Sequence, residues 1–223
     1  MSKVVVDIET VGFDFEKFPQ KDQEYLLKYA VTEEQREEIK KKTGLYPLTG
    51  EVVTIWMLNP ESEKGMVLFQ SKDKKIEKFE EDGIVYESGD EKEILEKFWK
   101  YIANFSTIIT FNGRGFDAPY LLLRSAIHRV RATKNLMGYR YDARVHCDLM
   151  EQLTFYGAVR KYNLDFCAKA FGIKSSKEEG IDGSMVSDLY KEGRYLDVAR
   201  YCHRDLMTTK ELYLNWEKYL KFD

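Results

Sequence analysis

Two carboxylates near the start of the sequence carry the chemistry that it suggests most directly. Asp7 and Glu9 flank Ile8 at the end of an apolar run that begins at Val4, a pattern typical of a buried β-strand. Side chains at positions i and i+2 of a strand point to the same face, so the two carboxylates should lie side by side. A charge without a partner is costly at the end of a hydrophobic strand. Because hard cations such as Mg²⁺ and Mn²⁺ bind carboxylate oxygens, the pair indicates a cation site.

Two later segments contain acids that could complete such a site. Asp117 would begin a helix just after a short buried strand predicted for residues 107–111. Asp205 lies on a helix predicted for residues 196–220, and Tyr201 stands one turn earlier on the same face. Four carboxylates from three separated elements, together with one phenol, could therefore converge on one point.

Such a set of residues suits hydrolysis of a phosphodiester bond. Two divalent cations roughly 4 Å apart can clamp the scissile phosphate between them. One ion activates the attacking water and the other stabilises the leaving 3′ oxygen, while the tyrosine would orient the water or help to deprotonate it. Taken singly, the three segments have ordinary interpretations as a strand, a tight turn and a surface pair. Their joint order and setting favour a nuclease site.

The same residues resemble the motifs of the DEDD, or DnaQ-like, 3′–5′ exonucleases, a superfamily with an RNase H-like fold. Its first motif is an Asp-x-Glu on the first strand, matched here by Asp7 and Glu9. Its second motif is an asparagine, a short spacer and Phe-Asp, matched by Asn112, Phe116 and Asp117. Each motif is short, but the motifs occur in the order and setting that this superfamily has.

The third motif resembles that of the tyrosine subclass. There it reads Tyr-x-x-x-Asp, matched by Tyr201 and Asp205. The histidine subclass would need a histidine five residues before the final aspartate, where this chain has Arg200, and His203 stands at a different offset.

A closer resemblance is to stand-alone predicted exonucleases related to the proofreading domain of family B DNA polymerases. Three further segments look like that group: Leu48-Thr49-Gly50, His146-x-Asp148-Leu149 and Asn163-Leu164-Asp165. The resemblance covers about residues 3–215 and includes no polymerase portion. For His146 and Asp148 themselves we favour a structural role at the end of a strand.

The resemblance implies roles for these residues and two divalent cations, Mg²⁺ or Mn²⁺, as cofactors. Asp7 would contact both ions. Glu9 and Asp205 would hold the ion that activates water, and Asp117 would bind the second ion, directly or through water. The resemblance also implies contacts with the terminal nucleotide from the backbone of Thr10, the side chains of Asn112 and Phe116, and Asn163.

The elements that must position these residues predict one α/β domain over residues 1–223, with a helical insertion at about 13–50. Strands are expected at residues 3–9, 52–58, 66–69, 107–111 and 145–148. Helices are expected at about residues 32–42, 90–105, 117–130, 149–156, 164–171, 185–192 and 196–220. The first three strands would form an antiparallel meander and the later ones would be parallel. This order predicts a mixed sheet flanked by helices, in agreement with the RNase H-like fold that the resemblance implies.

Charge is distributed unevenly along the chain. The 223 residues include 35 Lys and Arg and 38 Asp and Glu, a net charge of −3, whereas a protein that coats nucleic acid by bulk charge would be basic. The segment from Arg124 to Arg144 has six basic residues and one acid. Alone it is typical of a solvated helix and loop, but beside a nuclease site it becomes a candidate phosphate track. Phe13, Phe15 and Phe18 are weaker candidates for stacking on bases.

Cysteine usage and hydropathy indicate a cytoplasmic protein. Three widely spaced cysteines are typical of reduced, mostly buried thiols, and no apolar run is long enough for a membrane span. The first strand begins by Lys3, which leaves no room for a removable signal peptide. We expect no membrane contact, and the sequence identifies no protein partner.

We expect a metal-dependent 3′–5′ exonuclease that hydrolyses phosphodiester bonds at 3′ ends of single-stranded DNA and releases nucleoside monophosphates. A 3′–5′ exoribonuclease is the alternative with the same chemistry, because sugar discrimination depends on contacts to the 2′-OH that the sequence does not place. A non-catalytic nucleic-acid-binding RNase H-like module is a second alternative, against which the complete set of four acids and a tyrosine argues. A domain that binds a protein partner through residues 13–50 is a third.

Overall fold

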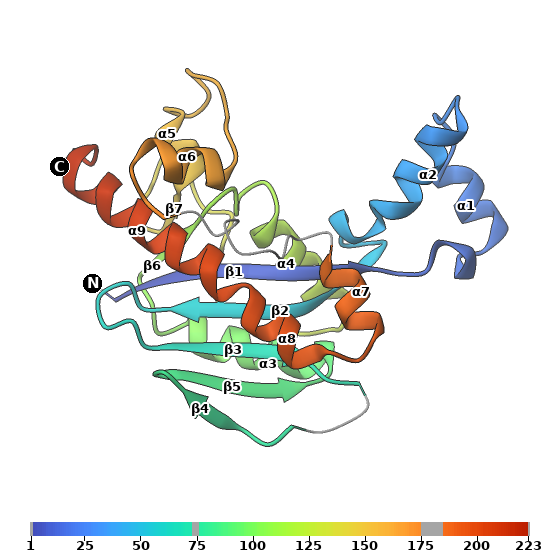
Figure 1. Ribbon diagram of the computed structural model, residues 1–223, viewed down its shortest axis with the longest axis horizontal. Coiled ribbons are helices and arrows are strands. Elements are labelled where there is room, and N and C mark those ends of the chain that lie inside the picture. The colour runs from blue at the N-terminus through green and yellow to red at the C-terminus, as the bar shows by residue number, and fades with distance from the viewer. Residues whose placement is uncertain (1, 73–75, 175–184, 223) are drawn as a thin grey trace.

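The computed structural model describes residues 2–72, 76–174 and 185–222, and these residues form a mixed seven-stranded sheet with helices on both faces (Figure 1). The strand order is β4-β5-β3-β2-β1-β6-β7, which places β1 inside the sheet. The strands are β1 (Lys3–Gly12), β2 (Gly50–Leu58), β3 (Gly65–Gln70), β4 (Phe79–Glu81), β5 (Ile84–Gly89), β6 (Thr107–Thr110) and β7 (His146–Asp148). The predicted fold class, α/β and RNase H-like, is confirmed.

The pairing of the strands agrees with the prediction except at one edge. β1, β2 and β3 form the antiparallel meander, and β6 and β7 continue the sheet as parallel strands. At the other edge, β5 pairs in parallel with β3 and β4 pairs antiparallel with β5, and neither strand was predicted. Asp82 and Gly83 join them with φ values of 52° and 79°, as in the tight turns of two-residue hairpins.

Helices cover both faces of the sheet. In the described part of the chain, the helices after β2 are α3 (Glu91–Ile102), α4 (Asp117–Ile127), α5 (Leu149–Leu153), α6 (Leu164–Ala170), α7 (Val186–Lys191), α8 (Tyr195–Tyr201) and α9 (His203–Tyr219). α3 and α4 pack on one face, and α7, α8 and α9 cross the other, with α5 and α6 against α9 (Figure 1). No helix in the described ranges is long and apolar enough to cross a membrane.

Two helices begin with capping boxes. The Asp90 side chain accepts from the Glu93 backbone N–H at the start of α3, and the Glu93 carboxylate accepts from the Asp90 N–H. Thr32 and Gln35 make the same reciprocal pair in the insertion. Each box satisfies two backbone donors that a helix start otherwise leaves without partners.

Alternation along β1 decides which face carries the acids. Its even-numbered residues from Val4 to Ile8 pack into the core under α3 and α4. Val5 packs into the other core, beneath α7, α8 and α9. Asp7 and Glu9 follow Val5 at intervals of two residues, so their side chains point to the face that α8 and α9 cover.

The sequence predicts one continuous helix over residues 196–220, but the structure has two helices there. α8 ends at Tyr201 and α9 begins at His203. The indole nitrogen of Trp56 donates to the Ala199 carbonyl at 2.7 Å, the acceptor that the His203 N–H would use in an unbroken helix. Tyr201 therefore lies at the end of one helix, and the acid of the third motif lies in the first turn of the next.

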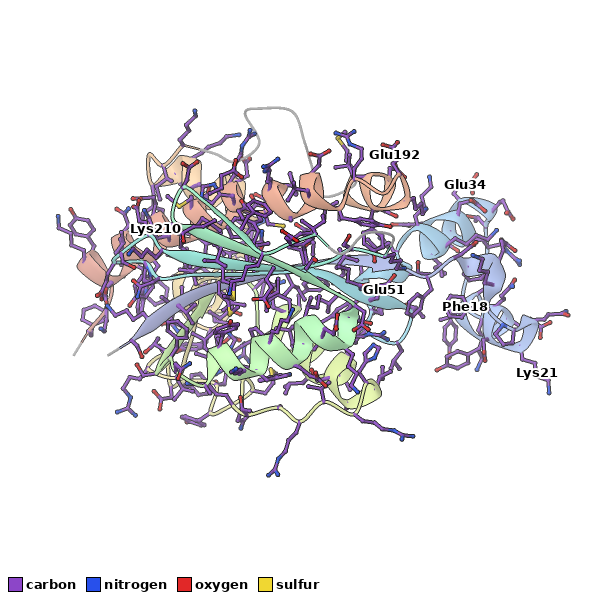
Figure 2. All side chains as sticks on the ribbon, turned by 90° about the horizontal axis from the view of Figure 1, so that it is seen from below. Phe18, Lys21, Glu34, Glu51, Glu192 and Lys210 are labelled. Carbon is purple, nitrogen blue, oxygen red and sulfur yellow. The ribbon has the colours of Figure 1, made fainter. Side chains whose placement is uncertain are left out.

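Residues 13–49 form the insertion between β1 and β2 and project beyond the end of the sheet (Figures 1 and 2). The insertion contains the short 3₁₀ turns η1 (Phe15–Lys17) and η2 (Thr43–Leu45) and the helices α1 (Gln20–Leu26) and α2 (Glu33–Lys41). In Figure 2, Phe18, Lys21 and Glu34 lie on the projecting part and Glu51 lies near its base.

Candidate active site

The open edge of β1 positions the second motif against the first. Parallel pairing of β1 with β6 ends at Val5, so the β6 side of β1 has no strand partner at Ile8. Instead, the Asp117 carboxylate accepts from the Ile8 backbone N–H at 3.1 Å. This hydrogen bond fixes the first residue of α4 beside the segment that carries Asp7 and Glu9.

A β-bulge follows the acids on β1. Glu9 lies opposite Thr54 of β2, but Thr10 lies opposite Val52, so Val53 has no opposite residue. Bulges increase the local twist and redirect side chains, and they are common next to active sites. Here the bulge separates the acidic part of β1 from the part that leads into the insertion.

The four predicted carboxylates lie close enough to affect one another. Burial raises the pKa of Asp7 well above its usual value, and the negative charges of Asp117, Glu9 and Asp205 raise it further. Three elements, β1, α4 and α9, therefore bring their acids to one place, as the sequence predicts.

The pKa values of Glu9 and Asp117 are raised for the same reasons. Burial raises the pKa of Glu9 to about 8, with added repulsion from Asp205 and Asp117, while a hydrogen bond from Cys202 opposes the shift. Burial also raises the pKa of Asp117 to about 7, with repulsion from Asp148 and opposing hydrogen bonds from the backbone. Both carboxyl groups are therefore held in an environment that lacks compensating positive charge.

This environment fits divalent cations. Among the described residues, no lysine or arginine forms an ion pair with Asp7, Glu9, Asp117 or Asp205. Asp117 is buried, whereas Asp7 and Glu9 are partly exposed, so a ligand can reach them. Carboxylate oxygens are the donors that Mg²⁺ and Mn²⁺ prefer, and bound cations would supply the missing positive charge.

Cys202 belongs to the site, although the sequence alone predicts only a reduced, buried thiol for it. Its Sγ donates to Glu9 Oε1 at 3.3 Å. One potential ligand atom each from Asp7, Glu9 and Cys202 lies within 4.8 Å of the others. Burial and the charges of Glu9 and Asp7 raise the pKa of the thiol, so Cys202 acts as a hydrogen-bond donor that orients Glu9. The available signal was its position inside the third motif, beside Tyr201.

Asp148 organises the loop of the second motif. Its carboxylate accepts from the backbone N–H groups of Asn112 and Arg114, each at 2.9 Å. Asn112 adopts a φ of 65°, in the left-handed region that asparagine tolerates. His146 is buried between Thr110 Oγ1 and a backbone carbonyl. These contacts support the structural interpretation of His146 and Asp148.

The predicted nucleotide-contacting residues lie in two regions. Thr10 and Phe116 line the same groove as Glu9, and the Thr10 hydroxyl donates to the Gly44 carbonyl at 2.7 Å. Asn112 lies in the loop before α4. Asn163 is exposed at the start of α6, where its side chain accepts from the Phe166 N–H at 2.9 Å and so caps that helix.

Tyr201 is half-buried at the end of α8. Its side chain packs against the core that lies between the sheet and α7, α8 and α9, a core that includes Cys202. Asp205 lies one turn further along the chain, in α9. The role of Tyr201 in orienting water stays a prediction.

The predicted phosphate track is wrong at Arg124, which is buried rather than exposed. Its guanidinium donates to both oxygens of Glu91, at 2.8 and 2.6 Å. His128 is half-buried and contacts Glu91 Oε2 at 2.7 Å. Arg144 pairs with Asp142 at 2.8 Å. Sequence spacing did not reveal the pairings of Arg124 and His128 because their acidic partner, Glu91, lies on another helix.

The fold and the acids define the class of protein as an RNase H-like hydrolase. Comparison with known proteins agrees with this class. Residues 61–221 match a family described as "Predicted 3′-5′ exonuclease related to the exonuclease domain of PolB". The chain belongs to this family of 3′–5′ exonucleases. The matched range begins after β1, so it does not include Asp7 and Glu9.

A curated relative points in the same direction. Over 134 residues, or 53% of this chain, the sequence is 25% identical to DNA polymerase 1 of Sulfurisphaera ohwakuensis. The aligned part is 15% of that polymerase, so the chain spans only a small fraction of its length.

Proposed function

We propose that this chain is a divalent-cation-dependent exonuclease that removes nucleoside monophosphates from the 3′ ends of single-stranded DNA. The main support is the convergence of Asp7, Glu9, Asp117 and Asp205 without a basic partner among the described residues. A non-catalytic module would have little use for such repulsion, since it lowers stability. We propose that residues 1–223 act as one RNase H-like domain with an insertion at about 13–50.

The residues that would hold two cations are those of the three motifs. Asp7 would contact both ions, Glu9 and Asp205 would hold one, and Asp117 would hold the other. When bound, the ions would activate the attacking water and stabilise the leaving 3′ oxygen. Tyr201 would orient that water.

Other side chains would keep these ligands in position. The Cys202 thiol restricts Glu9 through its hydrogen bond, and the Ile8 backbone N–H restricts Asp117. Preorganised ligands lose less conformational freedom when they bind, which favours both affinity and correct alignment of the substrate.

DNA is the proposed polymer, and RNA is the alternative. The family description refers to the exonuclease domain of PolB, and the curated relative is named a DNA polymerase. Both descriptions favour DNA as the substrate. A direct test supplies equal amounts of 3′-labelled single-stranded DNA and RNA in one reaction, with Mg²⁺ or Mn²⁺. We expect faster release of label from DNA. Preferential release from RNA would reassign the enzyme as an exoribonuclease.

The Asp7→Asn variant is the matched control, because it keeps the side-chain shape and removes one charge. We expect it to release no label from either polymer while it retains the wild-type circular dichroism spectrum. Equal activity of wild type and variant would exclude the proposed site.

A further inference from the structure

A groove of about 1630 Å³ begins at the acidic site and runs out between the insertion and the helices α7 and α8. Glu9, Thr10 and Phe116 line its inner end. We propose that this groove holds the substrate strand on the 5′ side of its terminal nucleotide, with the insertion as a fixed wall. This proposal rests on the proposed function. The insertion would thus be part of the substrate-binding surface.

The size of the groove favours a polymer over a small molecule. Pockets for small ligands typically enclose roughly 300–1,000 Å³. The groove exceeds that range, and it extends from the proposed catalytic centre to the outer part of the insertion at Phe18. Because the terminal nucleotide must lie at the acids, the rest of the strand has to leave the site along a surface that starts there.

Lysines outnumber acids along the groove. Six lysines line it, Lys17, Lys40, Lys41, Lys42, Lys72 and Lys191, beside five acids, Glu9, Asp14, Glu16, Glu51 and Asp188. Several pair with acids, as Lys72 does with Glu51 at 2.9 Å. In the part of the chain that the structure describes, Lys41 and Lys191 are exposed and no acidic side chain pairs with them. They stand on opposite walls, one on the insertion and one at the end of α7.

Contacts at its base make the insertion a fixed wall. The Gly44 carbonyl accepts from Thr10 Oγ1 at 2.7 Å and from the Tyr120 hydroxyl at 3.1 Å. The Phe13 N–H donates to the Thr49 carbonyl at 2.9 Å. The two bonds of Gly44 join the insertion to β1 and α4, and the bond between Phe13 and Thr49 holds its two ends together. A Cβ atom added at Gly44 would lie 2.8 Å from the Gly12 nitrogen, so the backbones there are in close contact.

The aromatic residues of the insertion support its structure more than they offer stacking surfaces. Phe15 is buried, and Phe18 packs against both Phe15 and Phe13 with ring centroids 6.2 and 6.5 Å apart. The Arg124 guanidinium lies over the Phe13 ring at 5.4 Å. The groove is therefore suited to binding through lysine–phosphate contacts, which are independent of base sequence.

The test measures binding in the Asp7→Asn background, in which the strand is not degraded. Fluorescence anisotropy would give the affinity for labelled oligo-dT over a range of salt concentrations. Each lysine–phosphate contact with a single strand contributes about 0.7 to the salt slope, and therefore about fivefold in affinity at 0.1 M salt. Replacing both Lys41 and Lys191 by alanine should weaken binding about 25-fold and lower the slope by about 1.4.

Lys21→Ala is the matched control, because Lys21 is an exposed lysine of the insertion that lies outside the groove (Figure 2). It should bind oligo-dT as the parent does. An unchanged affinity in the double variant, or an equal loss with Lys21→Ala, would overturn the groove proposal even if the wild type degrades DNA. If the wild type degrades neither polymer but the lysines still determine binding, the proposed function fails and the groove remains a binding surface.

Discussion

The acidic cluster predicts that the protein becomes more stable when one of its acids loses its charge. Asp7 is the best position for this change, because burial and three neighbouring carboxylates all act on it. Ligand atoms of Asp7 and Glu9 lie within 4.8 Å, where two full charges at an effective dielectric constant of about 20 repel by about 3 kcal/mol. Partial protonation of Glu9, whose pKa is about 8, reduces that figure at neutral to mildly basic pH.

We therefore expect Asp7→Asn to raise the free energy of unfolding by about 2 kcal/mol in the absence of metal, and to raise the melting temperature by about 5 °C. Urea denaturation followed by tryptophan fluorescence, at pH 8 with a chelator, measures the difference. Asp142→Asn is the control, because it removes a partly exposed acid that pairs with Arg144 and should cost at most about 1 kcal/mol.

Metal should reverse the order of stability between the two proteins. Mn²⁺ should stabilise the wild type and have little effect on Asp7→Asn, since a ligand that binds only the folded state stabilises it by mass action. If Asp7→Asn is less stable than the wild type in chelator, repulsion among the buried carboxylates does not destabilise the folded protein.

Three further results are expected. Glu9 and Asp117 have folded-state pKa values of about 8 and 7, above their unfolded values, so the folded protein binds more protons than the unfolded protein between these values. The stability of the metal-free protein should therefore fall as the pH rises from about 4.5 to 8. Melting temperatures that stay constant or rise over this pH range would contradict this. Arg124→Met should lower the free energy of unfolding by about 3 kcal/mol, because it removes the guanidinium that bonds both oxygens of the buried Glu91. Adding Glu91→Leu should recover part of the loss in urea titrations. Tyr201→Phe should lower kcat while calorimetric Mn²⁺ affinity stays the same; equal losses in both would mean that the tyrosine holds a ligand in place instead.

The stability cost of the site fits a general pattern. Functional residues often sit in environments that local rules of folding disfavour, and other parts of the fold compensate. Here the compensation includes the two cores on either side of β1, which consist largely of fully buried side chains such as Trp56 and Trp99.

Much of the site could be predicted because its information is local. The period of two along β1 places Asp7 and Glu9 on one face, and the strand-to-helix turn brings Asp117 to the same edge of the sheet. Both capping boxes were also predictable, since each depends on residues three positions apart.

The features that were missed depend on contacts between distant parts of the chain. The break between α8 and α9 follows from a hydrogen bond of Trp56, which lies on β2. The burial of Arg124 follows from Glu91 on α3, and the role of Cys202 follows from its contact with Glu9. In each case the residue type was compatible with the prediction, and the tertiary partner decided the outcome.

We propose that the four acids form a metal-dependent site for removal of 3′-terminal nucleotides. The most direct measurement uses single-stranded DNA labelled at its 5′ end and resolves the products by length over time. With Mg²⁺ or Mn²⁺, the wild type should give a ladder that shortens one nucleotide at a time, and chelator or Asp7→Asn should abolish it. Immediate release of the labelled 5′ nucleotide, or degradation that does not depend on divalent cations or on Asp7, would contradict the claim.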